Sequence, residues 1–146
     1  MRSKSRHPMT RLSPAPDVQR RLMLGVALLI GTASIGQAQD LPMRRFPQNA
    51  LRGVITFGEP PEVLLNDDLA RLSPGARIRG TNNLLVLSGT LTGVKSVVNY
   101  TLDNAGQLKD VWLLRNEEAA RKPWPSTPQE AEQWNFDAGN QIWSKP

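Results

Sequence analysis

The chain contains no cysteine, and its only histidine is His7, close to the amino end. Without cysteine no disulfide can stabilise the fold, so stability has to come from buried apolar surface and hydrogen bonds. The thiolate and imidazole ligands of common zinc, haem and copper sites are missing after residue 7, as are Ser-His-Asp and Cys-His nucleophile systems. We therefore expect no metal and no cofactor.

Excess positive charge is confined to the first 38 residues. The whole chain has a formal charge of +5, but residues 39–146 contain 12 basic and 12 acidic side chains. Nucleic-acid binding needs a concentrated basic face, and a chain balanced in this way predicts none. We expect no nucleic-acid partner.

The amino-terminal segment has the pattern of a cleaved export signal. Six basic residues precede or adjoin the apolar run Leu22–Gly31, and the small residues Gly36 and Ala38 match a signal peptidase site. The apolar stretch reaches about 15 residues, whereas a retained membrane anchor, the alternative reading, needs roughly 20. We expect residues 1–38 to be a signal peptide cleaved after Ala38, and a periplasmic or secreted bacterial product without a membrane span.

Two export routes fit this segment. The pair Arg20-Arg21 directly before the apolar run is typical of a twin-arginine signal. Gln19 and Gly25 depart from that pattern, which favours general secretion. The sequence leaves both routes open.

The remainder predicts a lead-in followed by β structure. Residues 39–50, with two prolines and the pair Arg44-Arg45, are expected to be irregular. Residues 51–115 are expected to form an antiparallel β domain that begins with a strand over Leu51–Phe57. Asn66–Asp68 predicts a tight reversal and Ser73–Gly75 a second turn.

Three runs with a period of two, within residues 85–92, 97–102 and 108–114, predict an antiparallel meander. So many short strands in about sixty residues favour a small barrel or two-sheet sandwich, resembling the OB-fold or SH3-like designs. The predicted core residues are Val54, Ile55, Val63, Leu65, Ile78, Leu85, Leu87, Val98, Tyr100, Leu102, Val111 and Leu113. Trp112 joins them if the other face of its strand is the buried one.

Residues 116–146 predict a short C-terminal extension packed on the barrel. Asn116 can cap a first short helix, and Thr127 with Glu130 forms a capping box that places Pro128 at the first position of a second helix. Residues 134–136 and 141–143 are expected to form a small hairpin.

Four aromatic residues of this extension lie within twenty positions: Trp124, Trp134, Phe136 and Trp143. Exposed indole rings stack on sugars and anchor partner proteins, so these residues are candidate contacts for a glycan or an envelope protein. The alternative is that they cover one end of the barrel in place of disulfides. Both interpretations remain open.

Charged residues offer two further candidates. Arg77 and Arg79 lie two positions apart, hence on one face of a strand, and with Arg71 they can bind a phosphate or carboxylate. A solvated outer face explains them equally well. The adjacent Asp67 and Asp68 supply carboxylates for a hydrolase, but neighbouring strand residues point to opposite faces, which favours a role as turn formers.

Three segments carry a resemblance: Arg79–Leu84, Asp110–Leu114 and Pro123–Pro128. With them the chain resembles small uncharacterised exported proteobacterial proteins, a group to which no activity is attached. The resemblance implies one exported domain and says nothing about mechanism.

The function expected from these observations is a non-enzymatic exported domain that binds or scaffolds a component of the cell envelope. The alternative is a module that binds a glycan or a small anion through the tryptophans or through Arg77 and Arg79. A hydrolase that relies on carboxylates alone is the third reading.

Overall fold

The structure of the chain, a computed structural model, describes residues 41–146. The predicted signal peptide and its cleavage position after Ala38 lie outside these residues. The strands, helices and core clusters given below all come from residues 41–146, so this part of the chain has a core of its own. Within it, no helix combines the length and apolar character that crossing a membrane requires.

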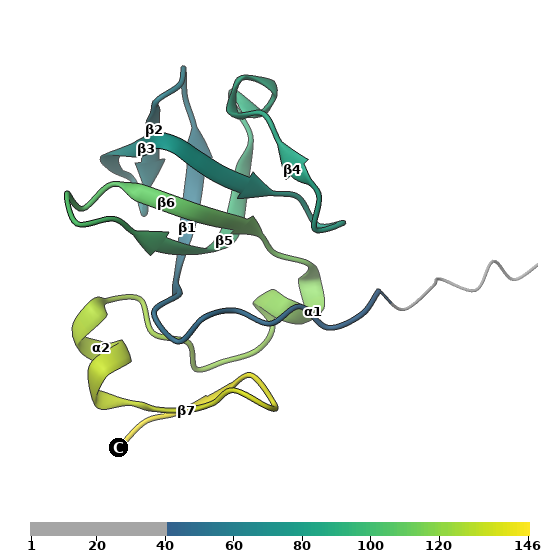
Figure 1. Ribbon diagram of the computed structural model, residues 1–146, viewed down its shortest axis with the longest axis vertical. Helices are drawn as coiled ribbons and strands as arrows, with labels where there is room; N and C mark the ends of the chain where they lie inside the picture. Colours follow the sequence, from purple (N-terminus) through teal and green to yellow (C-terminus); the bar gives the residue numbers. More distant parts are fainter. Residues whose placement is uncertain (1–40) are drawn as a thin grey trace, which may run out of the picture. The chain divides into compact units, whose positions relative to one another are not determined.

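Five strands close into a small β barrel (Figure 1). They are β1 (Leu51–Phe57), β2 (Glu62–Leu65), β3 (Asp68–Arg79), β5 (Lys95–Leu102) and β6 (Leu108–Leu113). The strand order is β2-β1-β5-β6-β3, and the pairing of β2 with β3 closes the sheet on itself. The short strand β4 (Leu85–Val86) pairs with the end of β3. The predicted mainly β fold, a small barrel, is confirmed.

The barrel contains one parallel pair, between β3 and β6, and its other pairings are antiparallel. After β4 the chain forms the 3-10 helix η1 (Ser88–Leu91). Strand β5 then lies beside β1, and β6 returns to lie beside both β5 and β3. This Greek-key connectivity matches the OB-type barrel among the designs expected. The predicted meander is correct for β5 and β6 but wrong for residues 85–92, which pair with β3 or form η1.

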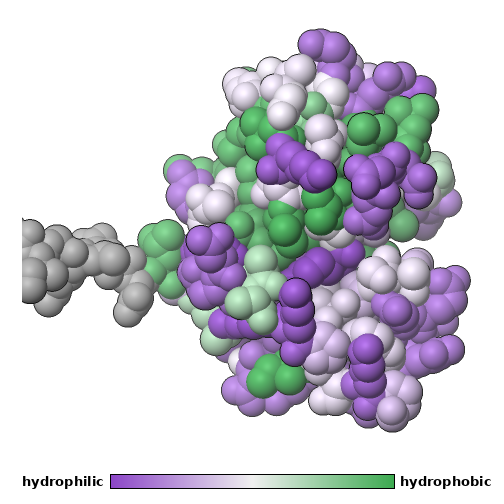
Figure 2. All heavy atoms as spheres, turned by 180° about the vertical axis from the view of Figure 1, so that it is seen from behind, coloured by the Kyte–Doolittle hydropathy of each residue, from purple (hydrophilic) through white to green (hydrophobic). Residues whose placement is uncertain are grey.

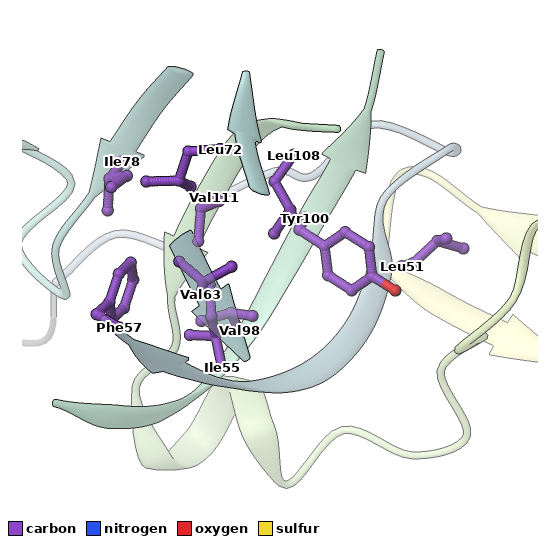
Figure 3. Close-up of a cluster of buried hydrophobic side chains, with 10 residues drawn as sticks. All are labelled: Leu51, Ile55, Phe57, Val63, Leu72, Ile78, Val98, Tyr100, Leu108 and Val111. Carbon is purple, nitrogen blue, oxygen red and sulfur yellow. The ribbon is translucent and has the colours of Figure 1, made fainter. Parts of the chain in front are cut away.

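Ten buried side chains form the core of the barrel, and most of them gather between its strands in Figure 3, with Leu51 beyond Tyr100 at one end. On β1 and β5 they occupy alternate positions, because successive residues of a strand point to opposite faces; on β6 a register shift separates Leu108 from Val111 by three positions. The core prediction is confirmed for Ile55, Val63, Ile78, Val98, Tyr100 and Val111. Leu65, Leu102 and Leu113 are partly buried and pack against the same cluster.

Three predicted core residues lie elsewhere. Val54 points to the outer face of β1, between the buried Gly53 and Ile55. Leu85 and Leu87 are 67% and 78% exposed. The alternation of apolar and polar residues around them correctly indicated a strand with two different faces. However, β4 pairs with β3 over only two residues at the edge of the sheet, and the chain then continues into η1. Neither leucine therefore reaches the barrel interior.

The reversal predicted at Asn66–Asp68 is confirmed as the β2–β3 hairpin, in which Asn66 and Asp67 have φ of 51° and 69°. The turn predicted at Ser73–Gly75 is wrong, because β3 continues through it. Gly75 has φ of 73°, and the pairing of β3 with β6 shifts register between Leu72 and Arg77. A bulge therefore bends the strand there without reversing it.

The C-terminal elements lie below the barrel in Figure 1. They are α1 (Asn116–Ala119), α2 (Pro128–Gln133), β7 (Asn135–Asp137) and β8 (Ile142–Ser144). As predicted, Thr127 caps α2, its Oγ1 accepting from the Glu130 N–H at 3.2 Å. The cap residue of α1 is Arg115 and not the predicted Asn116.

A second core cluster joins these elements to the barrel. Trp112 and Leu114, on the outer side of β6 and at its end, pack with Phe46 and Ala50 of the lead-in and with Trp124 and Trp143. Val111 faces the barrel interior, so both faces of β6 are covered. This explains why Trp112 is buried even though the opposite face of its strand forms the barrel core.

Candidate functional site

The outer face of β3 presents two arginines side by side. Ile78 points into the barrel, so its neighbours Arg77 and Arg79 point outward, as predicted from their spacing. The side chain of Arg77 is 54% exposed and that of Arg79 is 26% exposed. The structure therefore brings both guanidinium groups to one surface beside β6.

The residues of β6 next to these arginines give them only one counter-charge. Arg77 Nε donates to Asp110 Oδ1 at 2.9 Å, and Arg79 Nη1 lies 3.6 Å from the same oxygen. Thr101 Oγ1 donates to the other carboxylate oxygen at 3.3 Å, which fixes the orientation of Asp110. Arg79 also lies over the ring of Trp112, with 5.8 Å between Cζ and the ring centroid. Two cations share one carboxylate, so the surface stays positive.

The lead-in runs past this surface and is fixed by Arg44. The guanidinium of Arg44 is buried and donates to both oxygens of Glu118, to Gly80 O at 2.9 Å and to Leu113 O at 2.7 Å. The Phe46 N–H donates to Gln141 Oε1 at 2.8 Å, a second tie to the C-terminal extension. The lead-in therefore has no regular secondary structure but is held by buried hydrogen bonds.

Glu118 is the buried carboxylate of this arrangement. Burial raises its pKa, but hydrogen bonds from Arg44 and from the Arg115 N–H, with the charges of both arginines, outweigh burial and hold the pKa below its usual value. Arg115 also reaches outward, donating from Nε to Thr81 O at 2.7 Å and from Nη1 to Pro42 O at 3.1 Å. Arg44 and Arg115 are thus used in holding the lead-in and the loop after β3.

Between the lead-in and the sheet lies an open groove of about 670 Å³, here called the arginine groove. It is lined by Leu41, Pro42, Met43, Arg44, Arg45, Pro47, Arg77, Arg79, Asn82, Asn83, Asp110, Trp112 and Arg115. Five of these residues are arginines and one is acidic. Positive charge is therefore concentrated here in a domain that is nearly neutral as a whole.

The arginines of this groove differ in how many hydrogen bonds their guanidinium groups donate within the protein. Arg44 and Arg115 are bonded to backbone carbonyls and Glu118, whereas exposed Arg45 makes no hydrogen bond within residues 41–146. Arg77 and Arg79 share Asp110 and face the groove. Planar guanidinium groups bind carboxylates and phosphates through paired charge-assisted hydrogen bonds. Arg45, Arg77 and Arg79 can therefore bind an anion that enters the groove.

Sequence reasoning identified Arg77 and Arg79 but not Arg45, Arg115 or Asn82 as residues of this site. The pair Arg44-Arg45 was visible in the lead-in, yet nothing local placed it beside β3. Arg71, suggested as a third member, lies on the part of β3 that pairs with β2 and does not line the groove.

The four aromatic candidates of the extension gather in one place, largely inside the protein. Trp124 and Trp143 are buried, and Phe136 and Trp134 pack against them partly buried. The rings of Phe136 and Trp143 stack with centroids 4.6 Å apart, and Trp124 meets both edge-on. Trp124 Nε1 donates to Ala50 O at 3.0 Å. This packing corresponds to the second interpretation of these residues, a cluster that covers the barrel.

Trp124 and Trp134 also border a second open groove with Arg52, Lys122 and Lys145, but a cation of the same chain lies over each ring. Arg52 Cζ is 4.7 Å from the Trp124 centroid, and Lys145 Nζ is 5.1 Å from that of Trp134. A sugar would have to displace these cations to stack on the same ring faces. The groove therefore offers less to a glycan than the sequence indicated.

The acidic candidates do not face one another across a cleft. Asp67 adopts its positive φ in the β2–β3 turn, and Asp68 follows it as the first residue of β3, so both belong to one hairpin. Among residues 41–146, no group of three or more acidic side chains is placed to hold a metal ion.

Comparisons of the chain with protein-family models, with curated proteins and with solved structures gave no match.

Proposed function

We propose that this protein is an exported, non-enzymatic binding protein of the bacterial cell envelope that takes up a carboxylate or phosphate group in the arginine groove. Export is inferred from the amino-terminal pattern and from the resemblance to small exported proteobacterial proteins. Binding is inferred from the groove. The proposal keeps the expected class of function and moves the contact surface from the tryptophans to the arginines.

The observation that carries the proposal is the shared counter-charge of Arg77 and Arg79. Both guanidinium groups contact the single carboxylate of Asp110, while Arg45 on the lead-in has no acidic partner within residues 41–146. Structural arginines in the same region are satisfied by several acceptors, as Arg44 is. Unused donors on a preformed groove favour a ligand that supplies the missing negative charge.

The test is calorimetric titration of residues 39–146 with inorganic pyrophosphate and with citrate at low salt. We expect saturable binding that weakens as salt is raised, since exposed charges are screened. The double change Arg77→Gln with Arg79→Gln should lower the affinity at least about tenfold, because hydrogen bonds to charged groups contribute about 1.5–3 kcal/mol each.

Arg71→Gln is the matched control. Arg71 is an exposed arginine on the same strand, but it lies outside the groove, so its loss should leave the affinity within about twofold. Equal losses in the control and in the double variant would mean that only net charge matters. Absence of binding of either anion to the unaltered protein would contradict the proposal.

A further inference from the structure

We infer that the anion taken up by the arginine groove is the phosphate of an anionic phospholipid, so that this side of the barrel docks on a membrane surface. This inference rests on the proposed function and names the ligand class of that site. Several large apolar side chains lie exposed beside the arginines of the groove.

Exposed leucines and a methionine flank the groove. Leu41 and Met43 line it and are about half exposed. Leu84 and Leu85 follow directly after the lining residues Asn82 and Asn83 and are 65% and 67% exposed. These are four of the ten large apolar side chains that are most exposed among residues 41–146. A soluble anion such as citrate has no apolar groups that could pack against these side chains.

The pairing of the strands places apolar and cationic side chains in one row. Leu85 of β4 is the direct partner of Arg79, and Arg79 is the direct partner of Trp112 of β6. Directly paired residues project from the same face of a sheet, so Leu85 and Arg79 lie side by side on the outer surface. A phospholipid offers the matching chemistry, with a phosphate for the arginine and acyl chains beside it for the leucine.

Apolar exposure alone does not select this face, because a second patch exists. Figure 2 shows hydrophobic side chains across the barrel part of the molecule, among hydrophilic ones, on the side opposite to the view of Figure 1. Leu64 and Leu69 are paired across β2 and β3 and exposed, but the turn beside them carries Asp67 and Asp68. An anionic membrane would repel that turn. Charge complementarity therefore selects the arginine side as the docking face.

The experiment is co-sedimentation of residues 39–146 with vesicles of phosphatidylcholine alone and with vesicles that also contain phosphatidylglycerol. We expect binding to the phosphatidylglycerol vesicles and an increase of at least about tenfold in partitioning over phosphatidylcholine. Arg77→Gln with Arg79→Gln should abolish this preference. Leu84→Ser with Leu85→Ser should lower vesicle binding by about tenfold, because the chain then has less apolar surface to insert.

The leucine variant distinguishes the lipid from a soluble anion. Both leucines are exposed, so the fold should be kept, which circular dichroism checks, and pyrophosphate should still bind to the intact arginines. Leu69→Ser is the matched control, an exposed leucine beside the acidic turn, and should bind vesicles like the unaltered protein. Loss of vesicle binding in this control, with none in the Leu84 and Leu85 variant, would overturn the inference.

The remaining outcomes separate the inference from the proposed function. If pyrophosphate binds and phosphatidylglycerol vesicles do not, the lipid inference is wrong and the anion-binding proposal stands. If a soluble polyglutamate peptide displaces the protein from vesicles at equal concentration of charge, an acidic protein is the better partner and the inference is overturned. If neither pyrophosphate nor vesicles bind, both fail.

Discussion

Two sets of arginines lie within one small region of this protein, and they have different surroundings. Arg44 and Arg52 are buried or partly buried, and their donors reach several acceptors at once, mostly backbone carbonyls. Arg77 and Arg79 are on the open face of β3 and share one carboxylate. The first set joins distant segments of the chain, and the second set faces solvent.

Exposure and the number of acceptors, rather than charge, therefore separate a structural arginine from one that is available to a ligand. Burial, partly offset by the charge of Glu118 and reinforced by that of Arg121, lowers the pKa of Arg52 to about 10. A buried cation is tolerated at such a cost only when its hydrogen bonds are made inside the protein. The following changes test whether the two sets differ as this distinction predicts.

The largest effect is expected from Arg44→Met. This change leaves the Glu118 carboxylate buried without its main partner, and removing one member of a buried ion pair costs about 3–5 kcal/mol. Urea denaturation of residues 39–146 should show this loss as a lower midpoint. Arg45→Met, one residue away and exposed, is the control and should change stability by less than about 0.5 kcal/mol.

A smaller loss is expected from Arg52→Met. Arg52 donates to Asn99 Oδ1 at 3.1 Å and to the carbonyl oxygens of Glu118, Ala119 and Arg121, and so joins β1 to the end of α1 and the residue pair that follows it. Part of the site is open to water, so we expect about 2–3 kcal/mol of lost stability in the same denaturation experiment. A change no larger than that of Arg77→Gln would mean that these four contacts contribute nothing and would remove the distinction between the two sets.

The ion pair of Arg44 also predicts a pH dependence. The pKa of Glu118 in the folded protein lies below its unfolded value, so its contribution to stability is complete above pH of about 4.5 and is lost as the pH falls through the folded pKa. At neutral pH, Glu118→Gln should therefore be less stable than the unaltered protein. The difference should shrink in acid, because protonated Glu118 and glutamine are both neutral. A difference that stays constant from neutral pH to pH of about 2 would show that charge is not involved.

The smallest effect on stability is expected at the open face. Arg77→Gln with Arg79→Gln should change the free energy of unfolding by no more than about 1 kcal/mol, since exposed ion pairs contribute little. A thermal or urea unfolding curve checks this directly. A loss as large as that of Arg44→Met would place Arg77 and Arg79 among the structural arginines and remove the main support for the groove as a binding site.

Local patterns were sufficient for much of the barrel. The strand Leu51–Phe57 was predicted with its observed bounds. The reversal at Asn66–Asp68 and the antiparallel arrangement of the runs 97–102 and 108–114 were also predicted correctly. Each depends on residues that are close in sequence. The outward direction of Arg77 and Arg79 followed from alternation with Ile78 in the same way.

Two kinds of local evidence were misleading. Ser73-Pro74-Gly75 has the residues of a turn, but β2 and β6 pair with β3 before and after it, so the segment bends within one strand. Leu85 and Leu87 alternate as core residues do, yet a two-residue edge strand does not turn them toward the interior. Which face of a strand is covered depends on distant elements, and alternation alone does not supply that information.

The groove itself was beyond sequence reasoning. Its lead-in wall is held by Arg44 on Glu118, 74 positions along the chain, and by the Phe46 N–H on Gln141, 95 positions along. For the aromatic cluster, the residues that belong together were predictable but their exposure was not. The sequence identified Trp124 and Trp143 as a unit but could not decide whether their rings faced solvent or the barrel.

The buried ion pair of Arg44 with Glu118 has a consequence for the order in which the protein folds during synthesis. Arg77 and Arg79 precede Glu118 and Gln141 along the chain, so during synthesis they are made before the two residues that hold the lead-in in place. Closing such long loops is slow compared with local hairpin formation. A polypeptide that ends before Glu118 therefore carries Arg77 and Arg79 without the wall that the lead-in forms, and the groove exists only in the finished protein.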